Sequence, residues 1–289
     1  MKEIGILGYG VFGQAIGSLL KKNGHPFHPV DVGEAFHQPI DVLLLAVPVQ
    51  HMRTALREHS NGITEVSLVV NLSKGIERET GKLPHEIVTG ELGERPYTVV
   101  SGPSFASEIM AEIPTTVSIG GTDAASMEIV QTLLSQPHFT FEQAGTVLEL
   151  ELAGAMKNIY AIASGYVAGS GGGKNTHAHV QVVALREYTQ LIKALEGDGQ
   201  VIRPGVIGDL ILTTGSRESR NFLYGTALAE GTVRDDLTAE GVATAKGVAQ
   251  VAAAAGVKLP LVAATRALID QTDDAHELCY QALGFSIAP

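Results

Sequence analysis

The chain has 289 residues, with 20 lysines and arginines against 31 aspartates and glutamates, so its formal net charge is −11. This acidic balance excludes a broad surface for nucleic acid or for an anionic membrane. The single cysteine, Cys279, excludes an internal disulfide and a cysteine-based zinc cluster. No apolar run approaches the length of a membrane span and no basic leader precedes the first one, so we expect a cytoplasmic protein without integral membrane association.

Short apolar segments alternate with helical patterns over residues 1–145. Expected strands cover 3–7, 28–32, 41–47, 67–72, 97–101, 115–119 and 139–142, and expected helices cover 11–23, 50–59 and 123–135. Segments such as 41–47 are apolar on both faces, as strands in a sheet covered by helices on both sides must be. We therefore predict an α/β Rossmann-type N-terminal domain over 1–145, with a mostly parallel, doubly wound sheet.

The pattern changes at about residue 146, after which only helical segments are expected. They cover 146–168, 176–196, 205–214, 219–230, 239–255, 260–271 and 274–283. The sequence thus predicts an all-α C-terminal domain over 146–289. The glycine-rich segment at 169–173 is either a plain linker or a mobile loop beside the ligand cleft.

A glycine-rich turn directly follows the first expected strand and opens the first expected helix. Its residues are Gly8, Tyr9, Gly10, Val11, Phe12 and Gly13. Glycines in this position allow a tight turn and close approach of a pyrophosphate, which the N-terminus of the helix then binds. Residues 1–145 are therefore predicted to bind a dinucleotide, and Gly8, Gly10, Val11, Phe12 and Gly13 are the expected contacts. The alternative is a plain glycine-rich turn without a ligand.

Asp31 lies near the end of the second expected strand, where an acidic residue can accept a hydrogen bond from the adenosine ribose. No lysine or arginine occurs between Lys22 and Arg53, so a 2′-phosphate would lack a local cation. The pattern favours NAD over NADP, although Asp31 is equally compatible with an ordinary turn.

Two polar segments follow expected strands at the edge where an open α/β sheet binds its ligand. The segment after 67–72 brings Lys74 to that edge, where it is either a ligand contact or a solvated lysine. The second is 101–108, in which a rigid turn opens a new helix; it is either a binding turn or only a helix cap.

Lys157 stands in the middle of a helical segment, 150–163, that is apolar almost all round. Such a helix is buried, and a buried ammonium group needs a counter-ion. Asp209 is the natural candidate, since it lies in a second apolar segment and shares a helix face with Thr213. We expect Lys157 to be functional rather than a lysine that extends past the edge of the core.

Two further groups of residues are candidates for ligand sites. Arg220 begins a polar helix start and can bind a phosphate with its forked guanidinium group, although an exposed arginine is more often simply solvated. His177 and His179 are separated by one residue and so point to different sides of a helix, without a carboxylate or cysteine at ligand spacing. We predict no metal site.

Taken together, these segments resemble the NAD(P)-dependent sn-glycerol-3-phosphate dehydrogenase family over most of the chain. The matching blocks are Gly8–Gly13, Leu72–Glu77, Ser101–Ala106, Gly154–Asn158, Gly208–Leu210, Ser219–Asn221 and Glu240–Gly241. The resemblance implies a homodimer that reversibly reduces dihydroxyacetone phosphate to sn-glycerol 3-phosphate with NAD(P)H. The enzyme alternatives are a related reductase of another small phosphate or carboxylate ketone, and the non-enzyme alternative is an NAD-binding sensor or interaction protein.

The resemblance also assigns roles to individual residues. It implies that Lys157 exchanges the proton at the substrate oxygen, with Lys74 and Asp209 beside it as further catalytic groups. The implied substrate contacts are Lys74, Gly102, Ser104, Asp209, Ser219, Arg220 and Asn221. The implied cofactor contacts outside the glycine turn and Asp31 are Lys74, Ala106, Arg220 and Glu240.

The chain departs from the family in two places. The passage between the second and third expected strands is short and lacks the basic residues usual there, which leaves the choice between NAD and NADP open. The family's Asp-Asn-Thr-Arg and later Arg-Gly are here Lys174–His177 and Val183-Ala184. Changes in activity, substrate or dimer contact are all compatible with that second departure.

Overall fold

A computed structural model describes residues 2–234 and 237–286. The chain divides into two compact units, each described here by itself. The first unit comprises Met1–Lys74, Leu83–Glu151 and Arg203–Gly205, and the second comprises Gly75–Lys82, Leu152–Ile202 and Val206–Pro289. The sequence-based division at residue 145 into a dinucleotide-binding and a substrate-binding part is a prediction about function.

The first unit contains a seven-stranded sheet in the order β2-β1-β3-β4-β5-β6-β7. Its strands are β1 (Ile4–Leu7), β2 (His28–Val30), β3 (Val42–Leu45), β4 (Leu68–Asn71), β5 (Tyr97–Ser101), β6 (Thr115–Gly121) and β7 (Phe139–Gln143). All neighbours are parallel except the antiparallel pair β5 and β6. This confirms the mostly parallel sheet. Strand β2 stops at Val30, however, so Asp31 lies in the turn after it.

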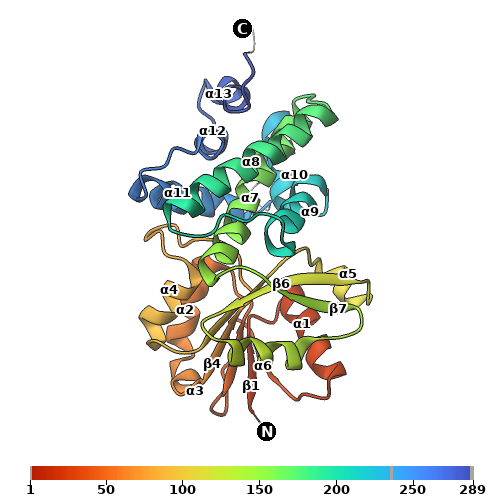
Figure 1. The fold of residues 1–289 in the computed structure, drawn as a ribbon, viewed down its shortest axis with the longest axis vertical. Helices are drawn as coiled ribbons and strands as arrows, with labels where there is room; N and C mark the ends of the chain where they lie inside the picture. The colour runs from red at the N-terminus through yellow and green to blue at the C-terminus, as the bar shows by residue number, and fades with distance from the viewer. Residues whose placement is uncertain (1, 235–236, 287–289) are drawn as a thin grey trace. The chain divides into compact units, whose positions relative to one another are not determined.

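Helices cover both faces of this sheet (Figure 1). They are α1 (Val11–Lys22), α2 (Val49–Glu58), α3 (Ser60–Ile63), α4 (Pro84–Leu92), α5 (Ala106–Met110) and α6 (Ala124–Leu134). Side chains of α1, α5 and α6 form one apolar core with the strands, while buried residues of α2 and α4, such as Met52 and Ile87, belong to the opposite layer. The doubly wound arrangement is therefore confirmed. The helical segments 60–63 and 84–92 were not predicted.

The carboxyl ends of the central strands share one edge. Leu7 pairs with Leu45, and Leu45 pairs with Asn71, so β1, β3 and β4 end at the same level. The segments that leave these strands, including the glycine turn at Gly8 and the segment that carries Lys74, begin along that edge. Parallel α/β sheets bind their ligands at this edge.

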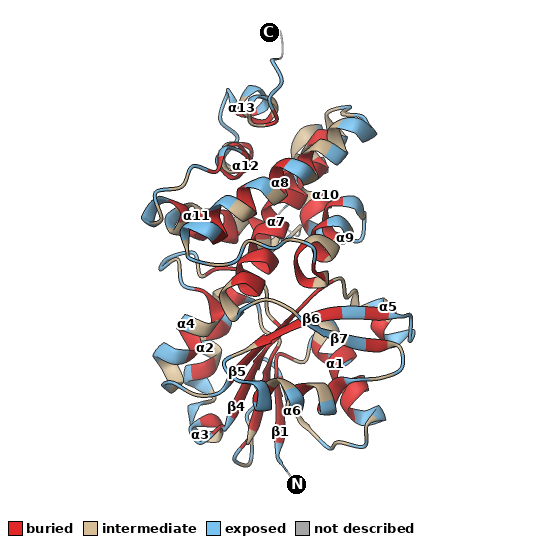
Figure 2. Cartoon of the chain, in the orientation of Figure 1, coloured by how far each residue is buried: buried red, intermediate tan, exposed pale blue. Residues whose placement is uncertain are grey.

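The second unit is helical. Its elements are α7 (Val147–Gly169, which begins in the first unit), α8 (Lys174–Ala194), the π-helical turn η1 (Pro204–Gly208), α9 (Asp209–Gly215), α10 (Arg220–Glu230), α11 (Glu240–Ala254), α12 (Pro260–Asp270) and α13 (Ala275–Ala282). No strand occurs in the described stretches 144–234 and 237–286, which confirms the all-α C-terminal part. Helix α7 is buried continuously from 149 to 165, as its apolar sequence predicts (Figure 2).

The glycine-rich segment at 169–173 forms a tight connection between α7 and α8. The amide of Gly172 donates to the carbonyl of Val167 at 2.8 Å. A Cβ atom on Gly172 would lie 2.4 Å from the Val167 side chain, so only glycine allows this close return of the chain. Helix α8 accordingly begins at Lys174, earlier than the predicted residue 176.

Across the described part of the chain, we find no helix whose length and apolar character would suit a membrane crossing.

Candidate active site

The glycine turn has the geometry that a dinucleotide pyrophosphate requires. Gly8 adopts φ +97°, and a Cβ atom there would lie 2.8 Å from the backbone of Ala46. A Cβ atom on Gly13 would lie 2.1 Å from the carbonyl oxygen of Gly8, so this glycine permits the close packing of α1 on the turn. Around Gly10 the Cβ position is open. The turn therefore fits the phosphates of a dinucleotide at the N-terminus of α1.

Val11 and Phe12, between Gly10 and Gly13 of this turn, point in different directions. Val11 is 68% exposed at the start of α1, on the open side of the turn. Phe12 is partly buried and packs against the apolar core.

Asp31 lies beside the glycine turn. The amide of Gly8 donates to the carbonyl of Val30 at 2.9 Å, which brings the end of β2 next to the turn. The Asp31 carboxylate is exposed and accepts a hydrogen bond from the amide of Val32 at 2.9 Å. An exposed carboxylate at this point is suited to a ribose hydroxyl and opposes a 2′-phosphate.

Three predicted residues of the first unit are brought together at the ends of β4 and β5. The Nζ of Lys74 donates to the carbonyl of Gly102 at 3.1 Å, and the hydroxyl of Ser104 donates to the same carbonyl at 2.9 Å. A Cβ atom on Gly102 would lie 2.9 Å from the Cα of Val117, so the strand ends pack closely. Ala106 begins α5 directly after this turn.

Lys157 forms the ion pair that its sequence context predicts. Its Nζ donates to the Asp209 carboxylate at 2.7 Å and to the hydroxyl of Thr213 at 2.8 Å. Lys157 is 9% exposed and Asp209 is 1% exposed, so the pair is largely shielded from water. Asp209 is the first residue of α9, and Thr213 lies one turn along the same helix. The arrangement fixes an ammonium group while leaving it a small exposed area.

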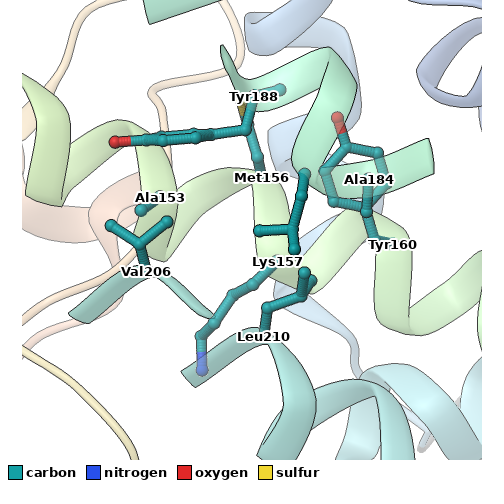
Figure 3. A pocket seen from close by; sticks show the side chains of 9 residues that line it. Ala153, Met156, Lys157, Tyr160, Ala184, Tyr188, Val206 and Leu210 are labelled. Carbon is teal, nitrogen blue, oxygen red and sulfur yellow. The ribbon is translucent and has the colours of Figure 1, made fainter. Parts of the chain in front are cut away.

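Apolar side chains surround the stem of Lys157 (Figure 3). A small pocket is lined by Ala153, Met156, Lys157, Tyr160, Ala184, Leu185, Tyr188, Val206 and Leu210. The stem of Lys157 runs past Val206 and Leu210, and its nitrogen lies at the end away from Met156 and Tyr160. These contacts hold the stem, so the position of the ammonium group is set by packing as well as by charge.

Asn221 links the start of α10 to α7 and α11. Its Nδ2 donates to the side-chain oxygen of Asn158 at 3.0 Å, and its Oδ1 accepts from the amide of Gly241 at 2.9 Å. Asn221 is thereby joined to Asn158, which directly follows Lys157 in the sequence, and to the start of α11 at Glu240. All three lie within the second unit. Ser219 caps α10 by accepting from the amide of Phe222 at 3.3 Å, while the side chain of Arg220 is exposed.

The two histidines of α8 have structural surroundings. His177 packs against Phe222, and burial lowers its pKa. His179 lies 3.0 Å from the carbonyl of Leu283. Within residues 2–234 and 237–286, no group of three histidine, cysteine or acidic side chains has the arrangement of a metal site.

Sequence reasoning missed two contributors to these clusters. Asn158 was seen only as a polar residue in an apolar helix, and its bond to Asn221 joins segments far apart in the chain. Glu151 is 2% exposed and bonds to Asn71 near Lys74. The available signal was the pair of carboxylates, Glu149 and Glu151, inside a helix that is apolar almost all round.

Comparison with known proteins gives one consistent result. Residues 28–127 match the family described as NAD-dependent glycerol-3-phosphate dehydrogenase N-terminus, and residues 147–280 match the corresponding C-terminus. The chain is 32% identical to glycerol-3-phosphate dehydrogenase [NAD(P)+] of Brucella ovis, over 93% of each protein. It is 34% identical to the Rhizobium etli protein of the same name, over 79% of this chain and 71% of that protein.

The fold is shared with solved structures. The crystal structure of glycerol-3-phosphate dehydrogenase from Coxiella burnetii matches with a TM-score of 0.90 at 24% identity, over 98% of this chain and 99% of that chain. A PanE/ApbA family ketopantoate reductase from Ralstonia eutropha matches with a TM-score of 0.58 at 14% identity, over 97% of this chain and 99% of that chain.

Proposed function

This chain belongs to the NAD-dependent glycerol-3-phosphate dehydrogenase family, and from that premise we propose that it reversibly reduces dihydroxyacetone phosphate to sn-glycerol 3-phosphate, with Lys157 as its proton donor and acceptor. It is an NAD(P)-dependent oxidoreductase. The observation that carries the residue assignment is the shielded ammonium group of Lys157, held at 2.7 Å by Asp209 and at 2.8 Å by Thr213.

The roles of the polar residues follow from the charge that develops on the substrate. When bound, the nicotinamide supplies or accepts the hydride at the substrate carbon. Lys157 stabilises the negative charge that grows on the carbonyl oxygen and delivers a proton to it, while Asp209 keeps the ammonium group oriented. Lys74 places a second positive charge near the substrate and helps to stabilise the same negative charge.

Further polar groups position the substrate phosphate and the cofactor. Arg220 is suited to a forked contact with phosphate oxygens, because its guanidinium group is exposed at the start of α10. Ser219 and Asn221 flank it and complete the proposed phosphate contacts. Gly102 and Ser104 are proposed to line the substrate site, and Ala106 and Glu240 to touch the cofactor.

We propose that residues 1–145 bind the dinucleotide and that 146–289 bind the substrate and carry the proton transfer. We also propose NAD over NADP as the preferred cofactor, because the exposed Asp31 carboxylate lies beside the glycine turn. Replacing Asp31 by serine should raise the use of NADPH relative to NADH by about tenfold in kcat/KM, which corresponds to roughly 1.4 kcal/mol. An unchanged ratio would contradict the assigned role of Asp31.

A homodimer is the proposed assembly, in keeping with the resemblance to the family. Light scattering coupled to size-exclusion chromatography measures the mass directly, and a mass near the 30.3 kDa of one chain would rule this assembly out.

The reaction is tested by following absorbance of the reduced cofactor with dihydroxyacetone phosphate and with a panel of other small ketones that carry phosphate or carboxylate. We expect oxidation of the cofactor with dihydroxyacetone phosphate and a much smaller rate with the others. Faster turnover of another ketone would reassign the substrate. Cofactor binding without turnover of any ketone would overturn the proposed reaction.

A further inference from the structure

A buried carboxylate lies under the segment that carries Lys74. Glu151 is 2% exposed and accepts hydrogen bonds at both oxygens. Asn71 donates to Oε1 at 3.0 Å and the hydroxyl of Tyr97 donates to it at 2.5 Å. The backbone amide of His85 donates to Oε2 at 3.3 Å, and its Nδ1 lies 2.7 Å from the same oxygen. A carboxylate that receives donors at both oxygens acts as an acceptor only.

This acceptor determines which way the Asn71 amide faces. Asn71 is completely buried, and its Nδ2 must point to Glu151 because a carboxylate accepts and does not donate. Its Oδ1 is thereby left facing the other way, where it accepts from the amide of Ser73 at 2.9 Å. The same Nδ2 also lies 3.2 Å from the Ser73 carbonyl. Asn71 therefore holds both backbone groups of the residue before Lys74.

Lys74 is the last residue of its unit before the chain passes into the other one. The two contacts of the Asn71 side chain with the backbone of Ser73 therefore set the direction in which the Lys74 side chain leaves the end of β4. Its Nζ then reaches the carbonyl of Gly102 at 3.1 Å. A small error in this direction is amplified along the four-carbon side chain of lysine.

We propose that Glu151 is a positioning residue for Lys74, acting through Asn71 and Ser73. The inference rests on the role proposed above for Lys74 in binding the substrate. His85 supports it by holding the second oxygen of the carboxylate. Burial lowers the pKa of His85, but its hydrogen bond to Glu151 and the charges of Glu151 and Glu86 raise it more, so its net pKa lies above the usual value.

The first measurement is hydrogen exchange at the Ser73 amide in the full-length protein. We expect Glu151→Leu and Asn71→Ala to speed this exchange clearly. The first removes the acceptor that orients Asn71, and the second removes the side chain that contacts Ser73. Glu151→Gln should retain part of the protection, since its oxygen can still accept from Asn71 while its NH2 group cannot accept from the backbone amide of His85. Unchanged Ser73 protection in Glu151→Leu would overturn the proposal, and this readout does not depend on which substrate the enzyme uses.

A matched control is available on the same helix. Glu149 is also a buried carboxylate near the start of α7, 1% exposed, but it pairs with Arg203 at 3.1 Å. Glu149→Leu should change stability without changing Ser73 exchange or kcat beyond about twofold, a difference of roughly 0.4 kcal/mol. An effect of Glu149→Leu on Ser73 equal to that of Glu151→Leu would mean that both act by general loosening of the fold.

The second measurement is a double-mutant cycle on kcat. Glu151→Leu should lower kcat about tenfold to a hundredfold, since misplacement of a contact group by about 1 Å costs that much. In a Lys74→Ala background the same change should have less than about a twofold effect, because the group that Glu151 positions is gone. An undiminished loss in that background would overturn the proposal. If Glu151→Leu does not fold, Asn71→Ala cuts the same link and takes its place in both measurements.

The proposed function and the proposed role of Glu151 can be overturned independently. Absence of dihydroxyacetone phosphate reduction in the unmodified enzyme would overturn the proposed function, whereas the Ser73 exchange result would still decide whether Glu151 orders the Lys74 segment.

Discussion

The two lysines proposed to meet the substrate are held in opposite ways. Lys157 is paired with the carboxylate of Asp209 at 2.7 Å inside a helical core, and both groups are nearly buried. Lys74 is half-buried at the end of a strand and bonds to a neutral backbone carbonyl, that of Gly102, at 3.1 Å. Lys157 is therefore fixed by a buried ion pair, and Lys74 contacts the backbone at a half-buried strand end.

This difference fits two different tasks. A group that transfers a proton must stay in place while its own charge changes, and a paired carboxylate with a second contact to Thr213 provides this. A group that binds an incoming oxygen must be able to exchange its resting contact for the ligand. A hydrogen bond to a neutral carbonyl is worth about 0.5–1.5 kcal/mol and is readily exchanged.

The largest expected effect comes from removing Lys157. Lys157→Met should lower kcat by about 10²–10⁴-fold, the usual contribution of a positioned proton donor, while leaving cofactor binding near normal. It should also lower the free energy of unfolding by about 3–5 kcal/mol, because Asp209 is left buried without its partner. Steady-state kinetics, cofactor titration and urea denaturation measure the three quantities.

A second variant separates chemistry from stability. Adding Asp209→Leu to Lys157→Met removes the unpaired charge, so much of the stability should return while turnover stays lost. An unimpaired rate in Lys157→Met would contradict its role as proton donor.

A smaller loss is expected at Lys74. Lys74→Met should lower kcat/KM by about 10²–10³-fold, as removal of one group that stabilises developing negative charge does. The free energy of unfolding should change less than in Lys157→Met, because Lys74 is half-buried whereas Lys157 is nearly buried beside Asp209. The exposed Lys82 provides the control, and Lys82→Met should match the unmodified enzyme in both measurements. A stability loss as large as that of Lys157→Met would erase the contrast between the two lysines.

The same contrast divides two buried carboxylates of the second unit. Asp209 faces an ammonium group, whereas Glu187 is 2% exposed and accepts from neutral donors: the amide of Leu261 at 2.5 Å, the amide of Val262 at 3.3 Å and the hydroxyl of Tyr160 at 3.1 Å. Burial raises the pKa of Glu187 to about 7, although these hydrogen bonds oppose the shift. The folded protein thus keeps a proton there that the unfolded chain releases near pH 4.5.

A pH dependence of stability follows from this proton. The stabilisation that the folded state gains by binding this proton more tightly is complete below the unfolded pKa of 4.5. It is lost as pH rises through about 7. Glu187→Gln mimics the protonated form, so the stability of the unmodified protein relative to this variant should fall by about 3 kcal/mol between pH 4.5 and 8. Urea denaturation at several pH values measures the difference, and a constant difference would show that Glu187 does not carry the proton.

The sequence predicted the elements and the charged pair better than the supporting bonds. Strand 97–101 and the long buried helix around Lys157 follow from apolar patterning, and Asp209 follows from the need of a buried ammonium group for a counter-ion. The link from Glu151 to Asn71 joins residues on different elements and leaves no periodic signal, so only the packed fold reveals it. The short helix 60–63 lacks a full apolar repeat, and the antiparallel pairing of β5 with β6 depends on how the connecting chain returns.

The smallest effect is expected at Tyr160, which contributes one neutral donor to Glu187. Tyr160→Phe removes this bond and should lower the free energy of unfolding by about 1 kcal/mol at pH 8, where Glu187 is ionised and depends on its donors. At pH 5 the carboxyl group is protonated, and the loss should shrink because a neutral acid gains less from an added donor. Tyr224→Phe, at a partly exposed position of α10, provides the control and should show no such dependence on pH. If Tyr160→Phe instead lowers the free energy of unfolding more at pH 5 than at pH 8, Glu187 is not the group that titrates. The contrast between Asp209, held by an ammonium group, and Glu187, held by neutral donors, would then not explain the stability of this core.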